Sequence, residues 1–201
     1  MAGLASRIGD SGLAARLARE IEGEVRFDAF TRGRYSTDAS IYQMEPIGVV
    51  VPRTEQDLRV AVQIAAEEGI PVLPRGGGTS QCGQTVNTAL VLDCTKHLNA
   101  ITDYDAETNE VTVQPGLVLD HLNGWLKSRG RLFPVDVSTA SRATLGGMTA
   151  NNSCGGRSIH YGIMVDNVQA IDAILMDGTE ARFAHVPGNL GEMTQNGRYR
   201  E

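Results

Sequence analysis

A run of glycines followed by hydroxyl residues is the part of the sequence best suited to bind a ligand. Residues 74–83 read PRGGGTSQCG, with Gly76, Gly77 and Gly78 in succession. Glycine accepts positive φ angles and has no Cβ that would keep a ligand away from the backbone. Successive amide N–H groups in such a loop can form a concave anion site, and Arg75 can neutralise phosphate charge. A plain surface turn is an equally good interpretation of this loop taken alone.

A second stretch rich in Gly and Asn, ATLGGMTANNSCGG at residues 143–156, favours the ligand-binding interpretation. Two well-known phosphate loops are excluded. The nucleotide-binding P-loop requires a Lys after its last glycine, and no Lys follows here. The dinucleotide fingerprint requires glycine at its first, third and sixth positions. Gln81 occupies the sixth position in the frame from Gly76, and Ser80 occupies the third in the frame from Gly78. The loop is therefore of a third kind.

Composition narrows the class of protein. A chain of 201 residues can bury a sizeable core as one domain or two small lobes. The net charge of −6 argues against nucleic acid as the main partner. No apolar run has the length of a transmembrane segment, and no secretory signal pattern opens the chain.

The cysteines predict neither a disulfide framework nor a metal site. Cys82, Cys94 and Cys154 are an odd number and lie far apart in the sequence, which favours a reduced, cytoplasmic setting. Cys82 and Cys154 are expected to be buried, as small apolar side chains usually are.

The first half of the sequence predicts a strand–helix–strand unit that leads into the glycine loop. Thr54 followed by Asp57 resembles a helix N-cap, and Gly69 closes the helical spacing. Such a unit implies parallel strands joined by a crossover helix. The expected elements are an amphipathic helix over 4–21, an irregular segment over 25–45, strands over 49–51 and 71–74, and the helix between them.

The second half predicts mostly antiparallel structure. Asp177-Gly178 is a strong hairpin turn, and Gly130 closes a helical pattern. The expected elements are a strand over 90–93, a hairpin of 101–104 with 110–114, a helix over 118–126, a loop-rich segment over 132–164, and a hairpin of 168–176 with 179–183. The fold class is therefore α+β with two lobes. Its parts are an N-terminal segment (1–44), a small lobe with a parallel β-α-β unit (45–93), a mostly antiparallel lobe (94–186) and a polar tail (187–201).

Several motifs in this order resemble one family. They are VVVPRTEQDLRVAVQIAAEEGIPVLPRGGGTS, a later Pro-Gly, LGGMTANNSCGG and Tyr161-Gly162. Together they resemble the FAD-binding domain of the p-cresol methylhydroxylase/vanillyl-alcohol oxidase superfamily, over about residues 45–183. The nearest branch is the FAD-linked D-2-hydroxy acid dehydrogenases, of D-lactate, glycolate and D-2-hydroxyglutarate type. The segments SQCGQTVN and ANNSCGGRSIHYG are most similar to members fused to an iron–sulfur half.

This resemblance implies that FAD lies between the two lobes, with its pyrophosphate on the first glycine loop. Members that bind flavin covalently through this loop carry a His near the glycines, whereas Thr79 and Ser80 follow them here, so we expect noncovalent FAD. The adenine is expected beside Gly162 and the Val168 backbone. The implied cofactor residues are Arg75, Gly76, Gly77, Gly78, Thr79, Ser80, Gly83 and Gln84 in the first stretch, Pro134, Ser138, Ala143, Thr144, Gly146, Gly147, Asn151 and Gly155 in the second, and Gly162 and Val168.

The implied reaction is hydride transfer from Cα of a D-2-hydroxy acid to flavin N5, which yields a 2-oxo acid. The electrons would pass to an iron–sulfur centre, a quinone or a carrier protein. Family enzymes take their base and carboxylate-binding Arg from a cap domain, which nothing after Phe183 can build. The chain alone is thus expected to be an inactive FAD module, and no catalytic residue is assigned. For the full-length protein, peripheral association with the inner membrane is an alternative to a purely cytoplasmic location. Alternatives are the flavin domain of a UDP-N-acetylenolpyruvoylglucosamine reductase or molybdenum hydroxylase, or a non-catalytic flavin-binding fragment.

Overall fold

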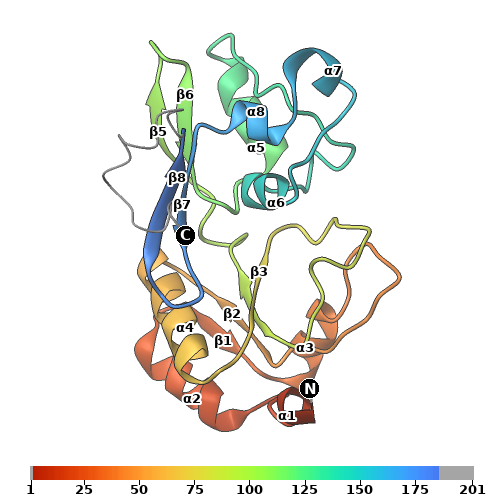
Figure 1. Ribbon diagram of the computed structural model, residues 1–201, viewed down its shortest axis with the longest axis vertical. Helices are drawn as coiled ribbons and strands as arrows, with labels where there is room; N and C mark the ends of the chain where they lie inside the picture. The colour runs from red at the N-terminus through yellow and green to blue at the C-terminus, as the bar shows by residue number, and fades with distance from the viewer. Residues whose placement is uncertain (1, 186–201) are drawn as a thin grey trace, which may run out of the picture.

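The computed structural model describes residues 2–185, which form two lobes along the long axis of the molecule (Figure 1). One lobe contains a four-stranded sheet, and the other contains a hairpin and several short helices. This architecture confirms the predicted α+β class with two lobes. The predicted polar tail over 187–201 lies outside the described residues.

The sheet of the first lobe has the strand order β1 (Glu24–Arg26), β2 (Gly48–Val51), β4 (Leu90–Asp93), β3 (Val72–Arg75). Strands β2, β4 and β3 are parallel, and β1 is antiparallel to β2. The predicted strands β2 and β3 are thus parallel but not adjacent, because β4 lies between them and pairs with both. All four residues of β4 are buried, as expected for the centre of a parallel sheet.

Helix α4 (Glu55–Glu67) makes the predicted crossover between β2 and β3. Its N-terminus has a capping box, in which Thr54 Oγ1 accepts from the amide of Asp57 at 3.1 Å and Asp57 accepts from the amide of Thr54. Asp57 is buried and also accepts from the amides of Glu22 and Arg53. The cap therefore connects the helix to two other segments of the lobe.

The N-terminal segment differs from its prediction. The expected single helix is two, α1 (Ala2–Ala5) and α2 (Ser11–Glu20), because Gly9 has a φ of +73° and Asp10 caps a new helix. The segment expected to be irregular contains β1 and α3 (Ala29–Tyr35). The apolar face of α2 packs into the core of the first lobe, through Leu13, Leu17 and Ile21 against residues such as Val50 and Ile64.

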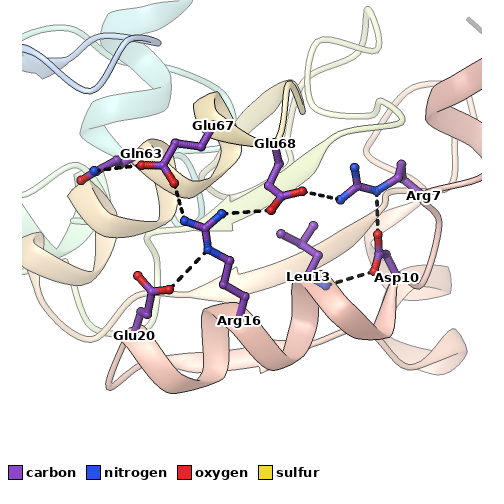
Figure 2. A network of polar contacts seen from close by, with 8 residues as sticks. All are labelled: Arg7, Asp10, Leu13, Arg16, Glu20, Gln63, Glu67 and Glu68. Carbon is purple, nitrogen blue, oxygen red and sulfur yellow. Dashed lines mark hydrogen bonds and ion pairs between the residues drawn. The ribbon is translucent and has the colours of Figure 1, made fainter.

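An ion-pair network joins α2 to α4 (Figure 2). The Arg16 guanidinium donates to Glu20, Glu67 and Glu68, so one side chain bridges the two helices. Arg7 donates to Glu68 at 3.1 Å and to the capping residue Asp10 at 2.6 Å. The N-terminal segment is therefore held on α4 by two kinds of contact. Ion pairs join the two at the protein surface, and the apolar face of α2 packs in the core.

The second lobe begins with the predicted hairpin of β5 (Ile101–Asp105) and β6 (Glu110–Val113), followed by α5 (Leu119–Lys127). The segment expected to be loop-rich contains three short helices, α6 (Leu145–Ala150), α7 (Ser158–Tyr161) and α8 (Met164–Asn167). They are too short to give a clear periodic signal. The buried side chains of α6 and α8, with those of α5, contribute to a second core, whereas α7 has none.

The last two strands, β7 (Ala170–Ile174) and β8 (Glu180–Ala184), form the hairpin predicted around Asp177-Gly178. The hairpin lies beside α4 (Figure 1), where Arg59 of α4 pairs with Glu180 and Ile174 packs against the first core. The chain thus returns from the second lobe to the first. Among the described residues, no helix has the length and apolar character needed to cross a membrane.

Candidate functional site

The two glycine-rich stretches meet between the lobes. A Cβ added to Gly76 would overlap the hydroxyl of Thr144, and one added to Gly77 would overlap the carbonyl oxygen of Arg142. The side-chain amide of Gln84 donates to Asn151 Oδ1 at 3.1 Å. Only glycine permits this approach of backbone to backbone. The structure therefore brings together two segments that lie far apart in the sequence.

The first glycine loop accepts hydrogen bonds at a few carbonyl oxygens and donates none through its amides. The carbonyl oxygens of Arg75, Gly78 and Gly83 accept from the amides of Cys94, Ala39 and Val86, at 3.2, 3.1 and 3.4 Å. Within residues 2–185, by contrast, no amide N–H of residues 76–84 donates a hydrogen bond. Gly78 and Gly83 have positive φ angles of 64° and 77°. A loop whose amides are all open suits an anionic ligand such as a phosphate group.

The side chain of Arg75, which we expect beside the phosphate, is hydrogen-bonded within the chain. Its guanidinium donates to the carbonyl oxygens of Thr85 at 2.8 Å, Thr37 at 2.9 Å and Tyr35 at 3.5 Å. It also lies over the Tyr35 ring, 5.4 Å from the ring centroid. Burial lowers the pKa of Arg75, and among the described residues no carboxylate forms an ion pair with it. The side chain thus supports the loop through carbonyl oxygens, and Asp38 and Asp93 act on its charge without forming an ion pair with it.

The second stretch is only partly available to a ligand. Thr144 caps α6 by accepting from the amide of Gly147 at 3.4 Å, while the amide of Gly146 is engaged by Pro115. Ala143 is buried in the second core, and its amide and carbonyl are bonded to Thr139 and Leu119. Ala143, Thr144 and Gly146 therefore shape this side of the site from within. Gly147 and Asn151 are the exposed residues of the set, with Ser138 on the preceding loop and Pro134 half-buried.

The residues expected at the adenine have engaged amides. The amide of Gly162 donates to Ser158 at 3.0 Å, and that of Val168 donates to Met164 at 2.9 Å as α8 ends. An adenine edge at Gly162 and Val168 would meet carbonyl oxygens rather than N–H groups.

A Cβ added to Gly155 would overlap the carbonyl oxygen of Asp136, so this glycine permits close packing of two loops.

The expectation that Cys82 and Cys154 are buried is wrong, since both are exposed in loops. Cys94, at the end of β4, is the buried one, and burial raises the pKa of its thiol to about 11. Nothing in the local sequence distinguishes the three, because loop exposure depends on the packing of distant segments. No group of His, Cys, Asp and Glu able to hold a metal ion occurs within residues 2–185.

Two surface hollows of the described chain are lined by residues outside the two glycine-rich stretches. One, of about 520 Å³, is lined by the C-terminal part of α5 and the turn around Gly130. The other, of about 420 Å³, lies between α3 and the sheet. Neither includes the open amides of residues 76–84. The chemistry of those amides, rather than the size of a hollow, therefore identifies the candidate site.

Comparison with protein families agrees with this geometry. The FAD binding domain family model matches residues 46–184. The chain is 39% identical over 160 residues to a D-2-hydroxyglutarate dehydrogenase of Escherichia coli (strain K12), and the aligned region covers 78% of this chain and 16% of that protein. It is 36% identical over 164 residues to the glycolate oxidase subunit GlcD of Bacillus subtilis (strain 168), and the aligned region covers 79% of this chain and 35% of that protein. The chain thus spans about a third or less of these relatives.

Solved structures share the fold. An alkyldihydroxyacetonephosphate synthase superposes with a TM-score of 0.77 at 19% identity, over 88% of this chain and 38% of the other. A xylooligosaccharide oxidase from Myceliophthora thermophila C1 superposes with a TM-score of 0.73 at 23% identity, over 87% of this chain and 37% of the other. At such identities the likeness concerns the fold alone.

Proposed function

The chain belongs to the family of FAD-binding domains, and from that premise we propose that it is the FAD-holding part of a dehydrogenase acting on D-2-hydroxy acids. The relatives named D-2-hydroxyglutarate dehydrogenase and glycolate oxidase subunit support this substrate class. The product would be the corresponding 2-oxo acid. Which hydroxy acid is used depends on parts of the relatives that this chain does not span.

The open amides of residues 76–84 are the observation that supports the proposal most directly. A diphosphate carries the charge and the acceptor oxygens that such amides bind. In the proposed site the backbone of 76–80 holds the diphosphate, and Gly83 and Gln84 continue the loop. Gly147 and Asn151 complete the site from the second lobe, and Pro134, Ser138 and Gly155 border it. Gly162 and Val168 stay proposed neighbours of the adenine, through their carbonyl oxygens.

When bound, FAD supplies the acceptor for the hydride that leaves Cα of the substrate. In this proposal the chain holds and orients the cofactor between two lobes, residues 45–93 and 94–186, and the described part of the N-terminal segment, residues 2–44, packs on the first lobe. The hydroxyl proton of the substrate passes to a base outside the residues assigned here. For the whole protein, the proposed electron acceptor is an iron–sulfur centre, a quinone or a carrier protein. Three unpaired cysteines support a reduced, cytoplasmic setting.

Titration of the purified chain with FAD, FMN and riboflavin tests the cofactor assignment. If loop amides hold a diphosphate, riboflavin should bind roughly a hundredfold or more weakly than FAD, since several charge-assisted hydrogen bonds are lost. Acid precipitation should release the flavin into the supernatant, as expected for noncovalent FAD. Equal affinity for FAD and riboflavin would contradict the diphosphate assignment, and flavin left on the precipitated polypeptide would contradict the noncovalent one.

Anaerobic reduction tests the substrate class, in the longest protein that contains this chain. D-2-hydroxyglutarate, D-lactate and glycolate are added in turn, with the L-enantiomers of the first two as controls. Bleaching of the flavin absorbance by a D-acid and not by its enantiomer would support the proposal. Flavin that binds tightly but is reduced by none of these acids would favour another reaction type or a non-catalytic carrier.

A further inference from the structure

A short hairpin before the family-matched region lies against the glycine loop. We call residues 36–44 the 36–44 hairpin. It is closed by a β-bridge between Thr37 and Gln43, and by a hydrogen bond from the amide of Met44 to the carbonyl oxygen of Ser36 at 2.9 Å. Figure 1 shows this orange segment beside the loop that follows β3. The family match begins at residue 46, so it gives the hairpin no role.

The hairpin contacts the glycine loop at three places. The amide of Ala39 donates to the carbonyl oxygen of Gly78 at 3.1 Å. The ring of Tyr42 covers Gly83, where an added Cβ would lie 2.6 Å from a ring carbon. Asp38 Oδ2 accepts from Thr85 Oγ1 at 2.9 Å and from the Thr85 amide at 3.4 Å. The hairpin therefore supports the loop from its glycine run to its end.

The side chain of Arg75 connects the same two segments. Its guanidinium donates to Thr37 in the hairpin and to Thr85 at the end of the loop. A Cβ on Gly78 would lie 2.6 Å from its Nη2 atom, so the guanidinium lies directly against that glycine. Asp38 adds a favourable Coulomb interaction with Arg75 but forms no ion pair with it. The role of Arg75 thus rests on its hydrogen bonds to the two segments rather than on an unopposed charge.

Asp38 is held as a carboxylate in this arrangement. Burial acts to raise the pKa of Asp38, but hydrogen bonds from Ser40 and Thr85 outweigh it, and the pKa lies below its usual value. The amide of Ser40 donates to Asp38 Oδ1 at 2.8 Å. One carboxylate therefore shapes the hairpin with one oxygen and fixes the loop with the other.

These contacts restrain the loop and leave its amides open. The hairpin engages the carbonyl oxygen of Gly78, covers Gly83 with the Tyr42 ring and holds Thr85 just after the loop, and none of these contacts engages an amide of 76–84. A loop of successive glycines is otherwise free to adopt many conformations, at an entropic cost on binding. Restraining it at these three places therefore orders the amides before a ligand arrives.

We propose that the 36–44 hairpin is part of the FAD site, and that Asp38 and Arg75 are positioning residues that hold the loop amides ready for the diphosphate. The inference rests on the proposed function, since it concerns affinity for that cofactor. It extends the site to a segment outside residues 46–184. Asp38 acts through Thr85, and Arg75 acts through Thr37, Thr85 and Gly78.

Two variants test the link between Asp38 and Thr85 from its two sides. Asp38→Ala removes the acceptor, and Thr85→Val removes the hydroxyl donor while keeping the side-chain shape. Each should weaken FAD binding about tenfold or more. The reason is that the loop of the variant is ordered only when FAD binds, and this ordering costs part of the binding free energy. Asp38→Asn keeps one acceptor oxygen and replaces the other by a donor, so its affinity should lie between that of Asp38→Ala and that of the unaltered chain. The double variant should weaken binding no more than the stronger single variant.

The matched control is Asp28→Ala. Asp28 also accepts from a backbone amide, that of Thr31 at 2.8 Å, but it caps α3 away from the loop. This variant should lower the melting temperature of the apo-protein without changing Kd for FAD. Hydrogen exchange gives a second readout, since FAD should slow exchange of the Ala39 amide in the unaltered chain and do so less in Asp38→Ala.

The outcomes separate the two proposals. If the unaltered chain binds no FAD, the proposed function is overturned, and this inference with it. If the unaltered chain binds FAD and both Asp38→Ala and Thr85→Val bind it equally well, the inference alone is overturned. A loss of affinity in Asp28→Ala equal to that in Asp38→Ala would also overturn it, since the effect would then reflect general stability.

Discussion

Gln84 and Asn151 are 67 residues apart in the sequence, yet a hydrogen bond of 3.1 Å joins their side chains. It connects the end of the first glycine loop to the C-terminus of α6, and thereby one lobe to the other. Both side chains are exposed, so the bond contributes little to stability, about 1 kcal/mol or less. Its significance lies in marking where the two lobes face each other across the proposed cofactor site.

Gly77→Val should abolish FAD retention. The new side chain would overlap the carbonyl oxygen of Arg142, and its β-branch would obstruct the approach of a phosphate to the loop. Kd from flavin fluorescence, beside the melting temperature of the apo-protein, checks this. Gly33→Val in α3, where an added Cβ meets nothing within 4 Å, is the control and should bind FAD normally. Undiminished affinity in Gly77→Val would refute the loop assignment.

Asp57→Ala should destabilise the protein by about 2–3 kcal/mol, because a buried acceptor of three backbone amides is lost. Urea unfolding at pH 7 measures this directly. Asp105→Ala provides the comparison, since Asp105 accepts from the amides of Glu107 and Thr108 at an exposed turn. Its cost should stay below about 1 kcal/mol. Similar losses in the two variants would mean that burial of the Asp57 cap contributes nothing.

Glu68→Gln should weaken the junction of α2 and α4 in a pH-dependent way (Figure 2). Hydrogen bonds from Arg7, and then from Arg16, lower the pKa of Glu68 below its usual 4.5. A carboxyl pKa lowered by folding contributes stability above the unfolded value, and this is lost as pH falls through the folded value. The variant should therefore be less stable at pH 7, by at most about 1 kcal/mol given solvent screening.

The difference between Glu68→Gln and the unaltered protein should shrink as pH falls below about 4.5 and the carboxyl becomes protonated. Urea unfolding at a series of pH values follows this. Glu107→Gln, on the exposed turn of the β5–β6 hairpin, should show no such convergence. A difference for Glu68→Gln that stays constant down to low pH would exclude an ionic origin.

Gly124→Ala should stabilise the protein by about 0.5–1 kcal/mol. Gly124 lies inside α5, an added Cβ meets nothing within 4 Å, and alanine loses less conformational entropy in a helix. Gly130→Ala, at a φ of +66° just after the helix, should instead be destabilising. Thermal unfolding of both variants checks the opposite signs. A loss of stability in Gly124→Ala would show that the surface of α5 is in contact with something else.

Local signals in the sequence predict several elements correctly. The Thr54 and Asp57 capping box, Gly69 and the Asp177-Gly178 turn each specify a helix end or a hairpin through bonds within a few residues. The break between α1 and α2 was available as well, since Asp10 precedes a helical pattern as an N-cap, but the continuous apolar spacing obscures it. The short β1 and α3 carry too few residues for a periodic pattern.

The sequence by itself predicted that the two glycine-rich stretches serve one ligand site, because glycines in such runs permit a backbone approach that no other residue allows. The motifs in their order also determined the FAD-binding family, which the family match confirms. Tertiary structure alone decided that β4 lies between β2 and β3, that Arg75 turns to carbonyl oxygens rather than outward, and that the 36–44 hairpin supports the loop. Each of these depends on hydrogen bonds between distant segments. Such bonds give no periodic pattern in the sequence, because the type of a residue does not reveal which distant residue it will contact.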